Sequence, residues 1–457
     1  MPPELTLCAR WAVLPDGLGP ANVTVRDGHI VAVTPAGPVP AGSTVLGDDE
    51  VLIPALTDTH VHLNEPGRTE WEGVRTGTRA AAVGGVTLLV DMPLNSDPVT
   101  TSLSALRTKV EAVQGQLHVD LGLWGGVVPG NAGELAPMVA EGALGFKAFL
   151  CHSGIDDFPA STEADLRAAM PILRDLGVPL LVHAELEAEL RGPLPEDHRS
   201  YVRYLHSRPK EWEDRAVALV ARLVEETGCR AHIVHLSSAG ALNILREAKK
   251  AGLPLTAETC PHYLGLASDE VPDGATAFKC APPIRERENQ HRLWEALMDG
   301  TLDVVVTDHS PCTPELKRFD TGDFESSWGG IASLQLGLRA VWTEARKRGM
   351  ALEEVVRLMS AAPASLIGLE RGAIEVGARA DLVVMRPEVE RAVDPAELLH
   401  RHPTTPWAGR VLAGEVRTTW MRGLPIVEDG RPVGDPMGEL VRGRHWRGGP
   451  GGSTFGA

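Results

Sequence analysis

Six side chains that can bind a metal, or become able to, stand at the ends of apolar segments that lie far apart in the sequence. They are His60, His62, Lys147, His183, His235 and Asp308. Each apolar segment is expected to be a buried strand, and each of these side chains falls at or near its last residue. Imidazole nitrogens and carboxylate oxygens bind divalent metals such as zinc. If the strands are parallel, their carboxyl ends meet at one face, and the pattern predicts a metal site there.

The histidines differ in how strongly their spacing supports this role. His60 and His62 are two residues apart, so on a strand they project to the same side, as a pair of ligands would. His183 and His235 close later apolar runs, although a buried histidine bonded to the backbone would fit each of them singly. His232 precedes His235 by three residues and should face the opposite way, so we exclude it.

The other two candidates bring different chemistry. Asp308 ends the run VVVTD, where a carboxylate could both bind a metal and move a proton; a turn or helix-capping role is the alternative. The adjacent His309 should point away. A protonated Lys147 cannot bind a cation. Only a carbamate, formed when CO2 adds to the neutral amine, would offer oxygen donors that bridge two metals, and the residue type alone does not favour this.

The elements that carry these residues alternate between strand-like and helix-like segments. Stretches with helical spacing, such as SLSALRTKVEAV, separate most of the apolar runs, which makes eight strand–helix units and predicts a (β/α)8 barrel. An open doubly wound sheet is the competing architecture, but no G-x-G-x-x-G motif follows an early strand. The runs are 51–56, 86–92, 117–128, 144–150, 178–184, 231–236, 254–258 and 302–307.

Both ends of the chain are rich in strands and turns. The alternating segment VTVRDGHIVAV, broken at Asp27-Gly28, is typical of a hairpin, and similar patterns return after residue 371. We predict one small β-sandwich-like domain built from residues 1–50 and 371–435, around a barrel domain at 51–370. The Gly-rich segment at 436–457 is predicted to be a flexible tail.

Composition limits the classes of function. The 457-residue chain carries a net charge of −17, which argues against non-specific nucleic-acid binding. No apolar run approaches the roughly 20 residues that span a bilayer, and no signal-peptide pattern is present at the start. The six cysteines are scattered without a C-x-x-C pair, so no disulfide framework is expected. We expect a cytoplasmic protein that binds neither nucleic acid nor membrane.

Eight ordered motifs between about residues 50 and 370 resemble allantoinases, a family of the cyclic amidohydrolase group that also contains dihydroorotases and hydantoinases. The motifs are HVHLNEPGRTEWEG, DMPLNS, WGGVVPGN, GFKAFL, SRPKEWE, ETCPHYL, KCAPPIR and TDHSPC. The resemblance implies two divalent metals, usually zinc, at the barrel mouth. By position it assigns all six residues above as ligands, with Lys147 carbamylated. Ala148, where similar chains often carry cysteine, departs from the pattern but should face away.

The resemblance also implies a reaction. A hydroxide shared by the metals would attack a ring carbonyl of allantoin, Asp308 would carry the proton to the departing ring nitrogen, and the ring would open to allantoate. A homo-oligomer, a tetramer in the family, is implied as well. A sister activity, dihydroorotase or hydantoinase, remains the main alternative. A non-catalytic scaffold is disfavoured because the ligand set is complete, and a mononuclear deaminase-like barrel because of Lys147.

Substrate preference depends on fewer residues. Dihydroorotases commonly place an arginine two residues after the second histidine, and this chain has Asn64 there, which suits an uncharged ring with a ureido group. Arg68 lies nearby and could still supply a cation. We predict substrate contacts from Asn64, Asn95 and Ser310, for which loop capping is the alternative, and more weakly from the main chain near Ala281.

Overall fold

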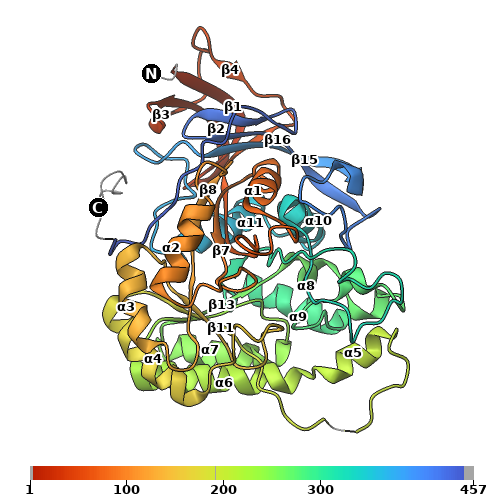
Figure 1. Ribbon diagram of the computed structural model, residues 1–457. Coiled ribbons are helices and arrows are strands. Elements are labelled where there is room, and N and C mark those ends of the chain that lie inside the picture. Colours follow the sequence, from red (N-terminus) through yellow and green to blue (C-terminus); the bar gives the residue numbers. More distant parts are fainter. Residues whose placement is uncertain (1–3, 191, 447–457) are drawn as a thin grey trace.

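The structure is a computed structural model that describes residues 4–190 and 192–446. Figure 1 shows two parts: strands ringed by helices, and above them a sheet to which both halves of the chain contribute. The first part positions the predicted metal ligands, and the second covers the opposite end of the barrel.

The parallel strands form a (β/α)8 barrel, as predicted. Strands β8 and β9 are separated only by Trp124 and act as one, which joins the sheet β6–β7–β8 to the sheet β9–β14. At the other seam, Val61 pairs with His309, and the amide of His62 donates to the carbonyl of His309 at 2.8 Å. Among the described residues, eight strand positions therefore close into a ring. The strands are β6 (Leu56–Val61), β7 (Val86–Asp91), β8 (Asp120–Leu123), β9 (Gly125–Gly126), β10 (Phe146–Phe149), β11 (Leu180–His183), β12 (Ala231–Ile233), β13 (Leu255–Thr259) and β14 (Val304–Val305).

The helices that follow these strands pack apolar faces against them. Helix α4, which follows the strand carrying Lys147, shows how the sequence sets its limits. Thr162 and Asp165 form a reciprocal capping box at its start, and Gly177 ends it with a left-handed φ of 65°. The helices are α1 (Val74–Val83), α2 (Leu103–Ala112), α3 (Ala132–Glu141), α4 (Glu163–Leu176), α5 (Tyr201–Ser207), α6 (Lys210–Thr227), α7 (Leu242–Lys250), α8 (Pro261–Gly265), α9 (Arg287–Met298), α10 (Gly337–Lys347), α11 (Leu352–Met359) and α12 (Ala361–Leu366).

The sheet from the two chain ends confirms that both halves of the sequence build one small β-domain. Its strands form a continuous mixed sheet in the order β18-β17-β16-β15-β5-β1-β2-β3, with β4 paired to β1. The halves meet where β5 pairs parallel with β1 and antiparallel with β15. The strands are β1 (Leu5–Leu14), β2 (Gly17–Arg26), β3 (His29–Pro35), β4 (Thr44–Val45), β5 (Val51–Pro54), β15 (Leu382–Ala392), β16 (Val411–Met421), β17 (Leu424–Glu428) and β18 (Arg431–Pro432).

Two details differ from the sequence-based prediction. The apolar run at 51–56, interpreted as the first barrel strand, is divided: Ala55 donates its amide to Asp381 in the end domain, whereas Leu56 donates to Gly85 in the barrel. Because both halves are buried, apolarity could not separate them. The predicted flexible tail also does not begin at 436, since Gly438 and Val441 donate to backbone carbonyls of Leu117 and Leu121. Residues 447–457 of that tail lie outside the described residues.

Two predictions from composition can be compared with the structure. All six cysteines are buried and unpaired, which agrees with the absence of a disulfide framework. Among the described residues, none of the helices combines the length and the apolar character that crossing a bilayer requires.

Candidate active site

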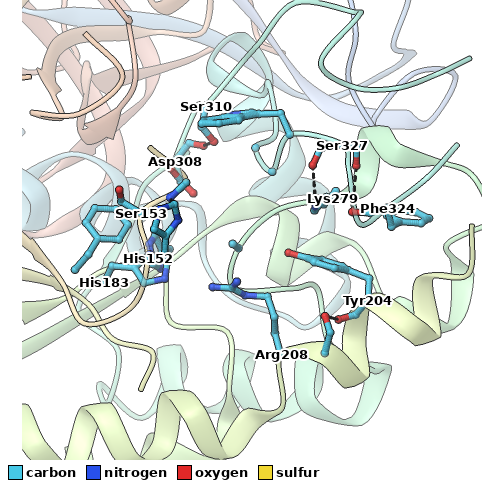
Figure 2. A pocket seen from close by; sticks show the side chains of 18 of the residues that line it. His152, Ser153, His183, Tyr204, Arg208, Lys279, Asp308, Ser310, Phe324 and Ser327 are labelled. Atoms are coloured by element: carbon cyan, nitrogen blue, oxygen red, sulfur yellow. Dashed lines mark hydrogen bonds between the residues drawn. The ribbon is translucent and has the colours of Figure 1, made fainter. Parts of the chain in front are cut away.

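The six predicted ligands come together at the carboxyl end of the barrel. Five different strands or the residues just after them supply these side chains: β6, β10, β11, β12 and β14. All six are buried and line one cavity of about 480 Å³. Figure 2 shows His183, Asp308 and Ser310 on one wall of this cavity, and Tyr204, Lys279 and Phe324 on the other. The barrel therefore brings these six side chains together at one face, as the pattern of residues at the strand ends predicted.

His60, His62 and Asp308 form the tightest group. The Nε2 atoms of His60 and His62 lie 3.2 and 3.4 Å from the same oxygen, Oδ1 of Asp308. Burial alone raises the pKa of Asp308, but the two histidines outweigh it and hold that pKa below its ordinary value. An ionised carboxylate with two imidazole nitrogens on one side is a ready set of donors for a divalent metal.

Glu258 at the end of β13 fixes the orientation of His60. Its Oε1 is hydrogen-bonded to Nδ1 of His60, which leaves Nε2 directed at Asp308. The carboxylate also bonds Nε2 of His232 at 2.9 Å and accepts the backbone amide of His235 at 3.1 Å. Carboxylates that hold the far nitrogen of a histidine in this way are typical of metal sites. His232, excluded as a ligand, thus acts on the site only through Glu258.

A second carboxylate, Glu185, has the same relation to His183. Nε2 of His183 lies 2.7 Å from Oε2 of Glu185, while the ring stacks on Phe149 with centroids 4.6 Å apart. Nδ1 of His183 has no hydrogen-bond partner among the described residues and is the nitrogen left for a metal. Glu185 is completely buried, and Arg208 balances its charge through bonds to both carboxylate oxygens.

His235 has a buried ring nitrogen that a metal could use. Its Nδ1 is buried and has no hydrogen-bond partner, and an unpaired buried polar atom is destabilising. The ring centroid lies 4.6 Å from that of His183 and 5.3 Å from that of His60. Burial, followed by the neighbouring His183 and Lys147, keeps the pKa of His235 well below its ordinary value, so its imidazole is neutral and able to coordinate.

Two of the candidate ligands also have strained backbones. His235 has a φ of 39° and Asp308 a φ of 43°, in the left-handed region that residues other than glycine rarely adopt. Such conformations are destabilising and are concentrated at functional sites, where they aim a side chain. Both residues follow their strands, β12 and β14, by a few residues and line the cavity.

Lys147 lines the same cavity, and no carboxylate in the described part of the chain forms an ion pair with it. Burial lowers its pKa to about 8, although Glu258 and Asp308 act against this shift. Its Nζ is 5.0 Å from the centroid of the Phe149 ring. The neutral amine, the form that adds CO2, is thus more accessible for Lys147 than for an exposed lysine.

The donor set fits divalent metals. Four imidazoles and one carboxylate converge, the buried Nδ1 of His235 is unsatisfied, and a lysine of lowered pKa lines the same cavity. The group Cys151, His183 and Glu185 could also surround an ion, but the guanidinium of Arg208 binds Glu185 and lies 3.8 Å from Sγ of Cys151. That cation makes the second group a poor metal site.

The predicted substrate contacts lie in different places. Asn95 and Ser310 line the cavity, as does Ala281. Nδ2 of Asn95 is 3.4 Å from Nδ1 of His62, and the hydroxyl of Ser310 donates to the carbonyl of Asp308 at 2.9 Å. Asn64 is buried beside the site, where its amide is 3.5 Å from the carbonyl of Pro311, and it does not line the cavity.

Comparison with known proteins agrees with this geometry. The model of the amidohydrolase family matches residues 51–427, so the chain belongs to the amidohydrolase family. An allantoinase of Streptomyces avermitilis is 50% identical over 442 residues, which cover 96% of this chain and 98% of that protein. An allantoinase of Arabidopsis thaliana is 43% identical, over 95% of this chain and 90% of that protein.

Solved structures give the same fold. The L-hydantoinase (dihydropyrimidinase) of Arthrobacter aurescens superimposes with a TM-score of 0.89 at 28% identity, over 96% of this chain and 99% of that one. The resemblance to cyclic amidohydrolases that the motifs indicated is therefore confirmed, and the chain is an amidohydrolase-family enzyme that acts on cyclic amides.

Proposed function

We propose that this protein opens the hydantoin ring of allantoin by hydrolysis and releases allantoate. The observation that carries the proposal is the convergence of His60 and His62 on Asp308, within a cavity large enough for a small heterocycle. Full-length similarity to proteins named allantoinase supports this substrate over dihydroorotate or simple hydantoins. The candidate metal ligands alone would be compatible with allantoin, dihydroorotate or a simple hydantoin as the substrate.

We further propose that two divalent ions, zinc as in the family resemblance, are held by His60, His62, Lys147, His183, His235 and Asp308. Lys147 would bind as a carbamate, since only that form of the side chain offers anionic oxygens. When bound, the ions polarise the ring carbonyl and acidify the attacking water. Glu258 and Glu185 hold His60 and His183 in the tautomers that this binding requires.

Asp308 is the proposed proton carrier. Its carboxylate is ionised, faces the cavity and is held between two imidazoles, so it can accept the proton of the attacking water. The same proton passes to the ring nitrogen as the C–N bond breaks. The opened molecule then carries an N–H at one end of the former ring bond and a carboxylic acid at the other, and this acid loses its proton to solvent to become a carboxylate. Asn95 and Ser310 are the proposed contacts for the ring, with Asn64 beside them.

The cellular setting is proposed on the same basis. We expect the enzyme to act on its small-molecule substrate in the cytoplasm as a homo-oligomer, with the tetramer of similar enzymes as the expected form.

The test of substrate is a parallel assay of purified, metal-loaded protein with allantoin, dihydroorotate and dihydrouracil. The kcat/KM for allantoin should exceed the other two by orders of magnitude. Metal analysis of the same sample should give two ions per chain. A preference for dihydrouracil would move the assignment to the hydantoinase type, and one ion per chain would contradict the two-metal site.

The bridging carbamate can be tested by Lys147→Ala. This variant should lose bound metal and activity together, and short-chain carboxylic acids should restore part of both by supplying the missing oxygen donors. Metal is measured by elemental analysis of the folded protein. Normal metal content in Lys147→Ala would contradict the carbamate.

A further inference from the structure

Arg208, which follows helix α5, reaches the cavity from the wall opposite Asp308 (Figure 2). Its Nε donates to Oε1 of Glu185 at 3.1 Å, and its Nη2 bonds the other oxygen of that carboxylate. Nη1 has no hydrogen-bond partner among the described residues, and the side chain keeps 20% of its surface exposed. One side of the guanidinium is thus anchored, and the other side offers donors to the cavity.

Neighbouring polar groups on this wall are bonded to the protein itself. Lys279 donates to the carbonyls of Glu325 and Ser327, at 3.2 and 2.5 Å. The Tyr204 hydroxyl donates to the carbonyl of Cys280 at 2.7 Å. Arg203 bonds the carboxylate of Glu325 and the carbonyl of Pro195. Arg208 differs in that two of its nitrogens bond a side chain next to the candidate metal site, while Nη1 has no hydrogen-bond partner among the described residues.

The anchor of Arg208 also sets its distance from the reacting centre. Glu185 bridges Arg208 and His183, because Oε2 of Glu185 is 2.7 Å from Nε2 of His183. The guanidinium therefore lies one side chain beyond a proposed metal ligand. Arg208 lines the same cavity as His60 and Asp308, so a substituent on a ring held at the His60–Asp308 group shares that cavity with the guanidinium.

We propose that Arg208 binds the carbonyl oxygen of the ureido substituent and so determines the preference for a ureido-bearing ring. This inference rests on the proposed function. It adds Arg208 to the proposed substrate contacts Asn64, Asn95 and Ser310. A guanidinium is suited to it because it donates in a fixed plane and stays charged. The bonds to Glu185 hold that plane before the substrate arrives, so little ordering is needed on binding.

The test compares allantoin with hydantoin, which has the same ring without the ureido group. In Arg208→Gln, the KM for allantoin should rise roughly 10- to 100-fold, the usual effect of one lost hydrogen bond to a charged group. The inhibition constant of hydantoin, measured as a competitor of allantoin hydrolysis, should change little. Arg208→Lys keeps a cation beside Glu185 and should give an intermediate rise in KM, which guards against a variant that fails to fold.

Glu185→Gln is the matched control. It loosens the anchor and the hold on His183 but keeps the guanidinium, so it should lower the metal content, weaken hydantoin as well as allantoin, and raise the KM for allantoin less than Arg208→Gln does. Equal changes for both compounds in Arg208→Gln, or an unchanged KM for allantoin, would overturn the proposal and assign Arg208 a structural role. If the unaltered enzyme does not hydrolyse allantoin at all, the proposed function itself fails, which is a separate result.

Discussion

The two ends of the barrel both bury carboxylates, but they surround them differently. At the amino end, Asp120 of β8 forms ion pairs with Arg371, Arg379 and Arg422, at 3.0, 2.6 and 3.1 Å, and accepts the amide of Glu439. At the carboxyl end, Asp308 faces two imidazoles and, among the described residues, no arginine or lysine within ion-pair distance.

This contrast distinguishes a buried carboxylate that holds the fold together from one that is placed for chemistry. The arginines around Asp120 come from the end domain, so that carboxylate joins the two parts of the molecule and its bonding capacity is filled. At the other end, the unpaired Nδ1 of His235 and the left-handed backbone of Asp308 are destabilising features of the kind that is concentrated at functional sites. In this fold, stabilising contacts lie at the amino-terminal face of the barrel, and the candidate active site lies at the carboxyl-terminal face.

Asp308→Asn should give the largest effect. The amide can still contribute an oxygen, but it cannot accept the proton, so kcat should fall by about 10⁴-fold. Thermal unfolding of the metal-free protein should show a much smaller loss of stability than Asp120→Ala gives, because Asp308 has two imidazoles beside it and, among the described residues, no arginine or lysine within ion-pair distance. The checks are a steady-state assay on metal-loaded protein and a melting curve on metal-free protein. Full activity would remove Asp308 from the proton path, and a large loss of stability would break the comparison between the two ends.

The convergence of the six side chains at the carboxyl end could be predicted from sequence because parallel strands place their last residues at one face. His60, His183 and Asp308 needed only the length of an apolar run and the residue at its end. The same reasoning failed at residues 51–56, where two buried strands of different sheets follow one another. An apolar sequence indicates that a segment is buried, but it does not indicate which sheet the segment is hydrogen-bonded to.

The supporting residues were missed for different reasons. Glu185 stands two residues after His183, the same spacing that paired His60 with His62, and that rule could have found it. Glu258 ends the run at 254–258 and was counted only as part of a strand. Arg208 lies in the motif SRPKEWE, but its contact with Glu185 joins separate segments, which only the folded arrangement brings together.

Asp120→Ala should give the next largest effect, on stability alone. Three arginines would lose their shared partner inside the protein, and breaking a buried charge network in this way destabilises by about 3 kcal/mol or more. Urea unfolding measures the loss, and kcat per metal-loaded chain should not change. Asp48→Ala, which removes an exposed partner of Arg10 on the end domain, is the control and should leave the unfolding midpoint unchanged. A fall in kcat for Asp120→Ala would show that the two ends are coupled.

Glu258→Gln should have a smaller effect, on metal affinity. An amide holds Nδ1 of His60 less firmly than a carboxylate does, and loss of such a partner weakens metal binding roughly 10- to 100-fold. Chelator competition measures the affinity. Glu213→Gln is a matched control, because Glu213 is also buried but bonds Arg285 and the amides of Ser237 and Ser238. It should affect stability and leave metal affinity unchanged; equal weakening in both variants would contradict the role of Glu258.

The smallest effect concerns pH and Asp120. Burial raises the pKa of Asp120, but Arg379, Arg371 and Arg422 outweigh burial and hold that pKa below its ordinary value of 3.8. A carboxylate whose pKa is lower in the folded state stabilises the protein above its unfolded pKa of about 3.9, and this contribution is lost as the pH falls through the folded value. The difference in unfolding free energy between the unaltered protein and Asp120→Asn should therefore be constant near neutral pH and shrink below about pH 4. Paired urea titrations measure it, since the comparison cancels other groups that titrate in both proteins. A difference that stays constant down to pH 3 would mean that the arginines hold Asp120 through shape and hydrogen bonding, and that charge adds little at the amino end.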